Sequence, residues 1–386
     1  MGTASTMACI AASLGLMPLK GASAPAVSSA RLRVAEETGR NAVAVALDKE
    51  NRRPQTLLST ESFLNAITVL QAIGGSTNAV VHLMAIINRH PDVAGKITLD
   101  TFNDIGRKTP LLVDLKPSGD NYMNDFHNAG GMIALLNHLR PLLYLSAKTI
   151  AGKTLGEELD TFRSFPYSLE IIRPLDNPIY PSSAIAVLRG NLAPNGAIIK
   201  ASASKDRRLL SHTGPAVVFT DTADLAQRID DPDLDVTEDS VLVLKGVGPI
   251  GNPGMPEAGV ISIPRKLGAQ GIQDMLRISD GRMSGTAGGT IVLHVSLEST
   301  VTESVFGMIE DGDLIELDLE QRSIQVRVPD EVITKRLASR ASDPAQRASE
   351  NAQKRERGYA GLYKRCVNQA DLGCDFDFLT ADGPSN

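Results

Sequence analysis

The chain has 386 residues, of which 42% are hydrophobic and 22% charged, as in an ordinary globular protein. This length is enough to bury a large core and predicts two domains. The formal net charge of −6 and the lack of a long basic run argue against nucleic acid as the main partner, and no apolar run approaches the ~18 residues of a membrane span.

The first thirty-five residues contain no Asp or Glu and are rich in Ser, Thr and Ala, a composition that imitates an organelle transit peptide. The competing interpretation is a packed helix from Thr3 to Leu16, with small residues at its contacts. We favour the helix. The three cysteines, Cys9, Cys366 and Cys374, are too few for a disulfide framework, and their spacing does not indicate a zinc site.

Residues 1 to about 165 are predicted to be mainly helical. One helix is expected to begin at Ser59, because apolar residues follow at helical spacing as far as Ile73. The glycine-rich stretch 74–78 should break it, and a second apolar helix is expected over Val80 to Ile87. A glycine-rich break before a helix N-terminus favours an anion, although a simple connection explains it equally well.

A polar loop covers residues 117–131 and leads into an apolar helix expected over Met132 to Leu139. His127 in this loop is a candidate catalytic residue. A lone histidine in a loop is more often a structural hydrogen-bonding group.

After about residue 165 the pattern changes to short β-rich runs separated by Gly, Pro and Asp. These runs are 197–199, 216–219, 241–244 and 291–293. Residues 313–319 and 323–328 alternate with period two and predict a hairpin. This half therefore predicts a barrel or closed sheet, followed by a charged helical tail from about Val332 to Ala360.

The most informative stretch is 278–290, in which Ser284 precedes a run of Gly, Ala and Thr and then a strand. A serine in such a tight turn, with exposed backbone N–H groups, can hold an activated hydroxyl close to a substrate. Turn chemistry alone also allows a plain loop.

Six motifs in order resemble the family of dihydroxy-acid, phosphogluconate and sugar-acid (aldonate) dehydratases. They are Met1–Met7, Ala72–Ala79, Pro117–Gly131, Val187–Pro194, Asn252–Glu257 and Asp280–Thr286. The resemblance covers essentially the whole chain, and GTASTM and RMSGTA look most like the arabinonate- or xylonate-type aldonate dehydratases. Two departures, Gly288 and the region 303–306, bear on the substrate rather than on the fold.

The resemblance implies an α/β fold, with the C-terminal part of an α/β cluster-binding domain, a swivel-type β-barrel domain and a helical C-terminal tail. The expected bounds are 1–165, 166–330 and 331–386. In the family, three cysteines upstream of the first motif hold an iron–sulfur cluster, expected to be 2Fe-2S, and upstream carboxylates and a modified lysine bind Mg²⁺. Because the chain begins past these positions, we expect it to be the C-terminal two thirds of such an enzyme, with no cluster ligands of its own.

The implied activity is a hydro-lyase (dehydratase) reaction that turns a 2,3-dihydroxy acid into a 2-keto-3-deoxy acid. By resemblance, Ser284 is the base as an alkoxide, Gly285 and Thr286 bind substrate, and Glu257 is a Mg²⁺ ligand. The cluster and Mg²⁺ would act as Lewis acids. The expected partners are a small sugar-acid or dihydroxy-acid substrate and further copies of the chain, in a homodimer or homotetramer. Neither nucleic acid nor a membrane is expected as a partner.

Two other interpretations remain open. One is a dihydroxy-acid dehydratase of branched-chain amino-acid synthesis, and the other is a non-catalytic truncated remnant without the cluster. An NAD-dependent oxidoreductase is excluded, because no G-x-G-x-x-G follows a predicted strand. The expected location is the cytoplasm, or the mitochondrion if the source is eukaryotic.

Overall fold

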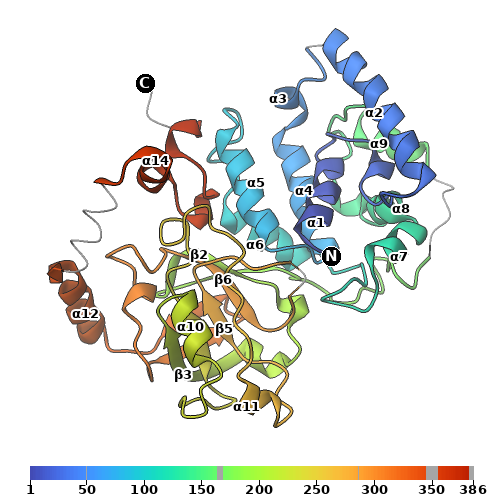
Figure 1. The fold of residues 1–386 in the computed structure, drawn as a ribbon. Helices are drawn as coiled ribbons and strands as arrows, with labels where there is room; N and C mark the ends of the chain where they lie inside the picture. Colours follow the sequence, from blue (N-terminus) through green and yellow to red (C-terminus); the bar gives the residue numbers. More distant parts are fainter. Residues whose placement is uncertain (49, 163–167, 286, 345–354, 382–386) are drawn as a thin grey trace. The chain divides into compact units, whose positions relative to one another are not determined.

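The computed structural model of the protein describes residues 1–48, 50–162, 168–285, 287–344 and 355–381 (Figure 1). The chain divides into two compact units. The first unit comprises Met1–Ala79 and His90–Ile185, and the second comprises Val80–Arg89 and Ala186–Asn386. The division between these two units lies after Ile185, and residues 331–386 fall in the second unit. The expected domain bounds at 165 and 330 stay predictions.

Helices are the main regular elements of the first unit in the part that the structure describes. Its helices are α1 (Thr3–Ser13), α2 (Ser29–Leu47), α3 (Pro54–Leu57), α4 (Thr60–Ala72), α6 (Leu99–Lys108), α7 (Met123–Asn128), α8 (Gly131–His138) and α9 (Leu155–Asp160). Short 3-10 helices cover Leu19–Gly21 and Arg140–Leu142. Within the described residues this unit has only isolated β-bridges, such as Leu111 with Tyr180, so the α/β expectation for the N-terminal part is not matched by a sheet here.

The predicted helices of this unit form where capping and apolar spacing favour them. Ser59 caps α4 by accepting a hydrogen bond from the Ser62 backbone nitrogen at 3.3 Å. The buried faces of α1, α4 and α8 share one core, which includes Cys9, Val69 and Leu135. The first residues of the chain are therefore a packed helix in this structure.

The second unit contains a closed eight-stranded barrel (Figure 1). Its strands are β1 (Ala186–Gly190), β2 (Ala193–Ile199), β3 (Ser211–Phe219), β4 (Val241–Leu244), β5 (Arg277–Ser279), β6 (Ile291–Ser296), β7 (Leu314–Asp318) and β8 (Ser323–Val326). Their order around the barrel is β1-β2-β6-β5-β4-β3-β7-β8. The predicted barrel is confirmed, and β7 and β8 form the predicted antiparallel hairpin.

Side chains along the strands alternate with period two between the inside and the outside of the barrel. Inward-facing residues such as Ile199, Val243, Ile278 and Val292 make up its core. Outward-facing Val217, Phe219, Leu242 and Leu244 pack instead against α10 (Thr222–Arg228), which lies beside β3 on the outside of the barrel (Figure 1).

The remaining helices of this unit are α5 (Asn78–Arg89, from Val80 on), α11 (Arg265–Gly268), α12 (Asp330–Ser342) and α14 (Gly358–Cys366). Short 3-10 helices cover Ala201–Ala203, Arg207–Leu210, Phe306–Met308, Ala370–Leu372 and Asp377–Leu379. Part of the predicted helical tail, residues 345–354, lies outside the described residues. Among the residues described, no helix is long and apolar enough to cross a membrane.

The strands β3, β4, β5 and β6 are parallel neighbours. The carboxyl ends of parallel strands meet at one edge of a sheet, and the segments that leave these ends are the usual place for ligand-binding residues. The segment after β4 contains Glu257, and the segment after β5 contains Ser284. Topology alone therefore brings the two segments with the predicted site residues to one edge of the barrel.

Candidate functional site

The segment after β4 is hydrogen-bonded directly to the segment after β5. The Gly259 nitrogen donates to the Arg282 carbonyl oxygen at 2.8 Å. A Cβ atom on residue 259 would lie only 3.0 Å from that oxygen, so the close approach favours glycine. Because Gly259 is two residues from Glu257 and Arg282 is two residues from Ser284, this bond fixes the two predicted residues in neighbouring segments.

The Arg282 side chain adds a second connection between the same segments. Its Nε donates to the Met255 carbonyl oxygen, and its Nη2 donates to the Gly254 carbonyl oxygen at 3.4 Å. The C-terminal segment supports this loop from another direction, since the Cys374 thiol lies 3.2 Å from the Met255 sulfur. The Arg282 guanidinium is thereby held against the loop that contains Glu257.

The four predicted site residues are placed as follows. Ser284 is half-buried in the segment after β5, where its carbonyl oxygen accepts from the Ala287 nitrogen at 3.1 Å in a turn. Gly285 is buried beside it, and Glu257 is exposed on the neighbouring loop. Thr286, the other predicted substrate-binding residue, lies outside the described residues.

Two histidines that the sequence did not single out belong to this site. His82 lies on α5, and the pKa of its imidazole is lowered by burial and by the Arg282 charge, while Glu257 acts in the opposite direction. His294 lies on β6, and burial, with Arg282 and His82 contributing, lowers its pKa to about 3. The charge of Arg282 therefore contributes to the lowered pKa of both histidines. His294 is a neutral imidazole at physiological pH.

A β-bulge explains the position of His294. The register between β2 and β6 shifts between Gly196 and Ile198, and His294 has φ of 58°. A bulge of this kind redirects a side chain out of the regular alternation and is frequent beside active sites. Such a local change in register leaves no mark in the hydrophobic pattern of the strand, so it could not be predicted from the sequence.

Two buried carboxylates hold the beginning of the Glu257 loop. Glu298 is completely buried, and its carboxylate accepts from the Ile250 nitrogen at 3.0 Å and the Gly251 nitrogen at 2.8 Å. It also accepts from the Gln369 amide at 2.8 Å. Asp280, four residues before Ser284, accepts from the Val247 nitrogen at 3.1 Å. Burial raises the pKa of Asp280 to about 6.

The described residues do not fit the iron–sulfur cluster that the resemblance implies. Cys9 belongs to the first unit, whereas Cys366 and Cys374 belong to the second. Burial raises the pKa of both Cys9 and Cys374 to about 12, so neither is a thiolate ready to bind iron. Among the described residues, no group of three or more His, Cys, Asp or Glu could hold a metal ion, and for Mg²⁺ Glu257 is a single predicted ligand.

Two other sequence candidates have structural partners within the first unit. His127 Nδ1 lies 3.2 Å from the Ser23 hydroxyl, as expected for a structural hydrogen-bonding group. In the glycine-rich break before α5, the Ser76 nitrogen donates to the Thr6 hydroxyl at 3.0 Å, and the Asn78 nitrogen donates to the Ser76 hydroxyl at 3.2 Å. These two nitrogens are not available to an anion.

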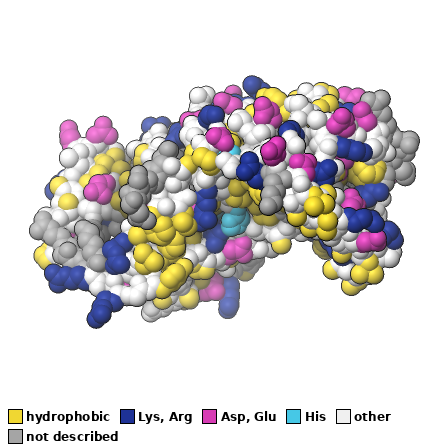
Figure 2. All heavy atoms as spheres, turned by 90° about the horizontal axis from the view of Figure 1, so that it is seen from above, with side chains coloured by type: hydrophobic (Ala, Val, Ile, Leu, Met, Phe, Trp, Pro, Cys, Tyr) yellow, Lys and Arg dark blue, Asp and Glu magenta, His cyan; other side chains and the backbone are white. Residues whose placement is uncertain are grey.

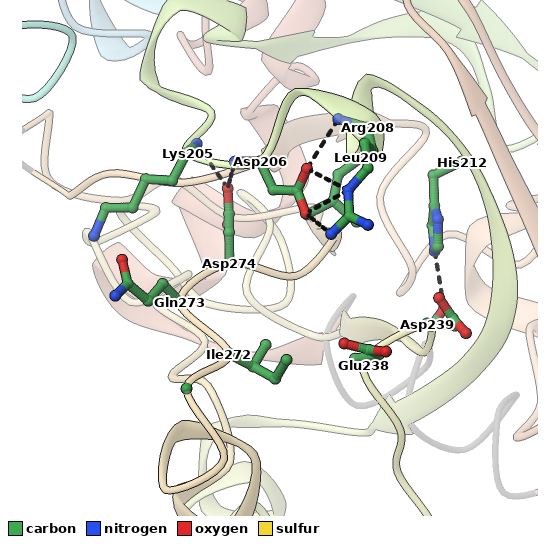
Figure 3. Close-up of a pocket in the computed structure, with 11 residues that line it drawn as sticks. Lys205, Asp206, Arg208, Leu209, His212, Glu238, Asp239, Ile272, Gln273 and Asp274 are labelled. Carbon is green, nitrogen blue, oxygen red and sulfur yellow. Dashed lines mark hydrogen bonds and ion pairs between the residues drawn. The ribbon is translucent and has the colours of Figure 1, made fainter.

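A polar pocket of about 500 Å³ lies elsewhere in the second unit (Figure 3). Its acidic side chains have partners within the protein, because Asp206 pairs with Arg208 at 2.7 Å and Asp274 accepts from the Lys205 backbone nitrogen at 2.9 Å. Glu257 and Ser284 are not part of its lining. On the molecular face in Figure 2, positive and negative side chains are interspersed, so this face shows no broad basic area for nucleic acid.

Comparisons with known proteins show which family the chain belongs to. Residues 1–158 match the dihydroxy-acid/6-phosphogluconate dehydratase N-terminal family, and residues 170–374 match the corresponding C-terminal family. The chain is 42% identical over 385 residues to 6-deoxy-6-sulfo-D-gluconate dehydratase of Pseudomonas putida, covering 99% of this chain and 63% of that protein. It is 44% identical over 376 residues to L-arabonate dehydratase of Azospirillum brasilense, covering 96% and 62%.

A third relative, dihydroxy-acid dehydratase 1 of Methanosarcina acetivorans, is 38% identical over 376 residues, covering 97% of this chain and 64% of the relative. The chain thus spans slightly less than two thirds of the length of each of these relatives. Matches to both domain families establish that the chain belongs to the dihydroxy-acid/6-phosphogluconate dehydratase family.

Proposed function

We propose that this protein is a hydro-lyase that converts a 2,3-dihydroxy sugar acid into a 2-keto-3-deoxy acid. The observation that carries the proposal is the hydrogen bond between Gly259 and Arg282, which joins the Glu257 loop to the Ser284 turn at the carboxyl ends of two parallel strands. Family membership supports the reaction class, and this junction supports the proposal that the reaction occurs at the Ser284 turn.

Ser284 is assigned as the base. As an alkoxide, its Oγ removes the proton from C2, and the hydroxyl group on C3 leaves as hydroxide. This hydroxide takes the proton from Ser284 to become water, which restores the alkoxide. The resulting enol takes a solvent proton at C3 and loses its O–H proton to solvent, which gives the keto acid. A serine hydroxyl is a very weak acid, so this role requires an environment that stabilises the alkoxide. The buried Gly285 and half-buried Ser284 lie in a tight turn that limits solvation by water.

Arg282 supplies positive charge to this environment. It lies two residues from Ser284, and its guanidinium is held by the carbonyl oxygens of Met255 and Gly254. Burial is the main cause of the lowered pKa of both His82 and His294, and the Arg282 charge adds to it. The same charge favours an alkoxide at Ser284 over the neutral hydroxyl.

The substrate class is proposed from the relatives. The chain is 44% and 42% identical to relatives named for L-arabonate and for 6-deoxy-6-sulfo-D-gluconate, and 38% identical to one named as a dihydroxy-acid dehydratase. Sugar acids are therefore preferred over branched-chain dihydroxy acids as the substrate.

The iron–sulfur cluster and Mg²⁺ implied by the resemblance remain part of the proposal for the whole protein, as does a homodimer or homotetramer. No step of the chemistry is assigned to the cluster or to Mg²⁺, because the described residues do not form a site for either. Substrate binding by Gly285 and Thr286 and metal binding by Glu257 are likewise proposals.

The test is product formation from a panel of acids after anaerobic incubation with iron, sulfide and Mg²⁺. The panel contains L-arabonate, 6-deoxy-6-sulfo-D-gluconate and 2,3-dihydroxyisovalerate, and 2-keto-3-deoxy acid is detected as its semicarbazone. Product from a sugar acid supports the proposal. Product from 2,3-dihydroxyisovalerate alone would show that the substrate is a branched-chain dihydroxy acid and not a sugar acid. A folded protein that gives no product from any acid contradicts the proposal and favours a non-catalytic role.

A further inference from the structure

Lys200 is a buried lysine with no described partner, and it lies in the same part of the barrel as the Ser284 segment. It follows directly after β2, is 8% exposed, and its Nζ has no hydrogen-bond partner within the residues that the structure describes. A buried amine without a partner is costly, and native proteins seldom keep one unless it serves a function. Burial lowers the pKa of this amine to about 7.

The strand pattern places Lys200 on the outer face of the barrel. Ala197 and Ile199 belong to the barrel core, so the alternation of β2 directs Ile198 and Lys200 outward. Ile199 is paired with Val292, which places Lys200 beside Ile291 at the start of β6.

The Ser284 segment crosses this same face. Because β5 and β6 are parallel, the chain between them has to return along the outside of the barrel. Met283 and Ala287 from this crossover pack with Ile291 and Leu293, the outward-facing residues of β6. The crossover also ends beside the 3-10 helix Ala201–Ala203, which follows Lys200, since the Gly289 nitrogen donates to the Ala203 carbonyl oxygen at 2.8 Å.

The charged side chains of the neighbouring segments have other partners. Arg207 Nη1 donates to the Ala201 carbonyl oxygen at 2.9 Å, and Asp274 pairs with Arg277 at 2.8 Å. Burial is the cause of the lowered pKa of Lys200, with no contribution resolved from a described charge. The Lys200 amine can thus become an ammonium cation, but no described carboxylate is paired with it.

We propose that Lys200 is a substrate-binding residue of this site, whose amine binds the carboxylate of the hydroxy acid beneath the Ser284 crossover. This assignment rests on the proposed function, which supplies an anionic substrate. Every 2,3-dihydroxy acid carries a carboxylate, and an ammonium–carboxylate pair forms charge-assisted hydrogen bonds. As the carboxylate binds, the neutral amine takes one proton from the buffer and becomes the ammonium partner.

The test measures proton uptake by titration calorimetry of the 386-residue chain with L-arabonate. The titration is done at about pH 8.5, where the free amine is mostly neutral, in two buffers with different ionisation enthalpies. The expected result is uptake of nearly one proton for each acid bound. Lys200→Met should remove the uptake and weaken binding at least about tenfold. Lys205→Met, which replaces an exposed lysine on a neighbouring turn, should change neither.

Several results would overturn the assignment. These are binding of L-arabonate without proton uptake, no binding of L-arabonate, or a Lys200→Met variant that keeps both affinity and uptake. Uptake with inorganic phosphate but not with L-arabonate would also overturn it, because the amine would then serve a free oxyanion. L-Arabinose, which lacks the carboxylate, should give no uptake.

The outcome is separable from that of the proposed function. Formation of keto acid without proton uptake on binding would support the dehydratase activity and contradict the assignment of Lys200 as a substrate-binding residue. Lys200-dependent uptake without keto acid from any member of the panel would support the carboxylate site and contradict the dehydration.

Discussion

Replacing Lys200 by methionine should make the protein more stable, which is the opposite of the usual result for a buried residue. Methionine keeps the length of the side chain and removes the amine, which has no described partner. The pKa of the amine falls from 10.5 to about 7 on folding, so the unfolded chain binds more protons between these two pH values. The free energy of unfolding of the wild type should therefore rise as the pH increases from about 7 to 10.5. This gain is lost as the pH falls back to 7.

The size of the effect follows from the same shift. Each pKa unit corresponds to about 1.4 kcal/mol, so the buried amine costs up to about 4 kcal/mol at pH 7. The advantage of Lys200→Met over the wild type should be larger at pH 7 than at pH 9, and it should fall by about 2 kcal/mol between these two pH values. Lys245, whose pKa burial lowers to about 8, contributes equally to both proteins and cancels in the difference.

The assay is urea unfolding followed by circular dichroism at about pH 7, pH 8 and pH 9, with Lys205→Met as the matched control. Lys205 is exposed, and its side-chain amine points away from Asp206 and Asp274 in Figure 3, so its replacement should leave the free energy of unfolding nearly unchanged. A Lys200→Met variant that is less stable than the wild type at pH 7, or whose advantage does not depend on pH, would refute the reasoning.

Three further predictions concern the site and its support. Ser284→Ala should lower the rate of dehydration by roughly 10³-fold or more with an unchanged circular dichroism spectrum, and a rate near that of the wild type would remove Ser284 as the base. Glu298→Ala should lower the free energy of unfolding by about 3 kcal/mol in urea, because it leaves the Ile250 and Gly251 nitrogens without their acceptor, and Glu298→Gln should cost less. The His294 imidazole should keep the nitrogen chemical shifts of the neutral form from about pH 8 down to pH 5, and a titration near pH 6.5 would show that it is not buried as described.

The elements that could be predicted are those whose signals are local. The Ser59 cap and the helical spacing after it predict α4, and period-two alternation predicts the hairpin of β7 and β8. β5 was missed, because it has only three residues and includes the polar Arg277, which pairs with Asp274. A strand that short carries no detectable alternation.

The site could be predicted only in part. Ser284 and Glu257 stand in recognisable motifs, but their junction depends on Gly259 and Arg282, which meet only because β4 and β5 are parallel neighbours. Lys200 at the end of a strand would ordinarily be expected in solvent. Its burial coincides with a crossover that comes more than eighty residues later in the chain, and such long-range packing leaves no local pattern.

The account depends most directly on Ser284 removing the C2 proton of a sugar acid. The decisive measurement is mass spectrometry of the product formed from L-arabonate in D₂O, for the wild type and for Ser284→Ala, after anaerobic incubation with iron, sulfide and Mg²⁺. The account predicts a 2-keto-3-deoxy acid with one solvent-derived deuterium at C3 from the wild type, and essentially none from the variant. Equal amounts of product from both proteins would contradict the assignment of Ser284, and a folded wild type that forms no product would contradict the proposed function.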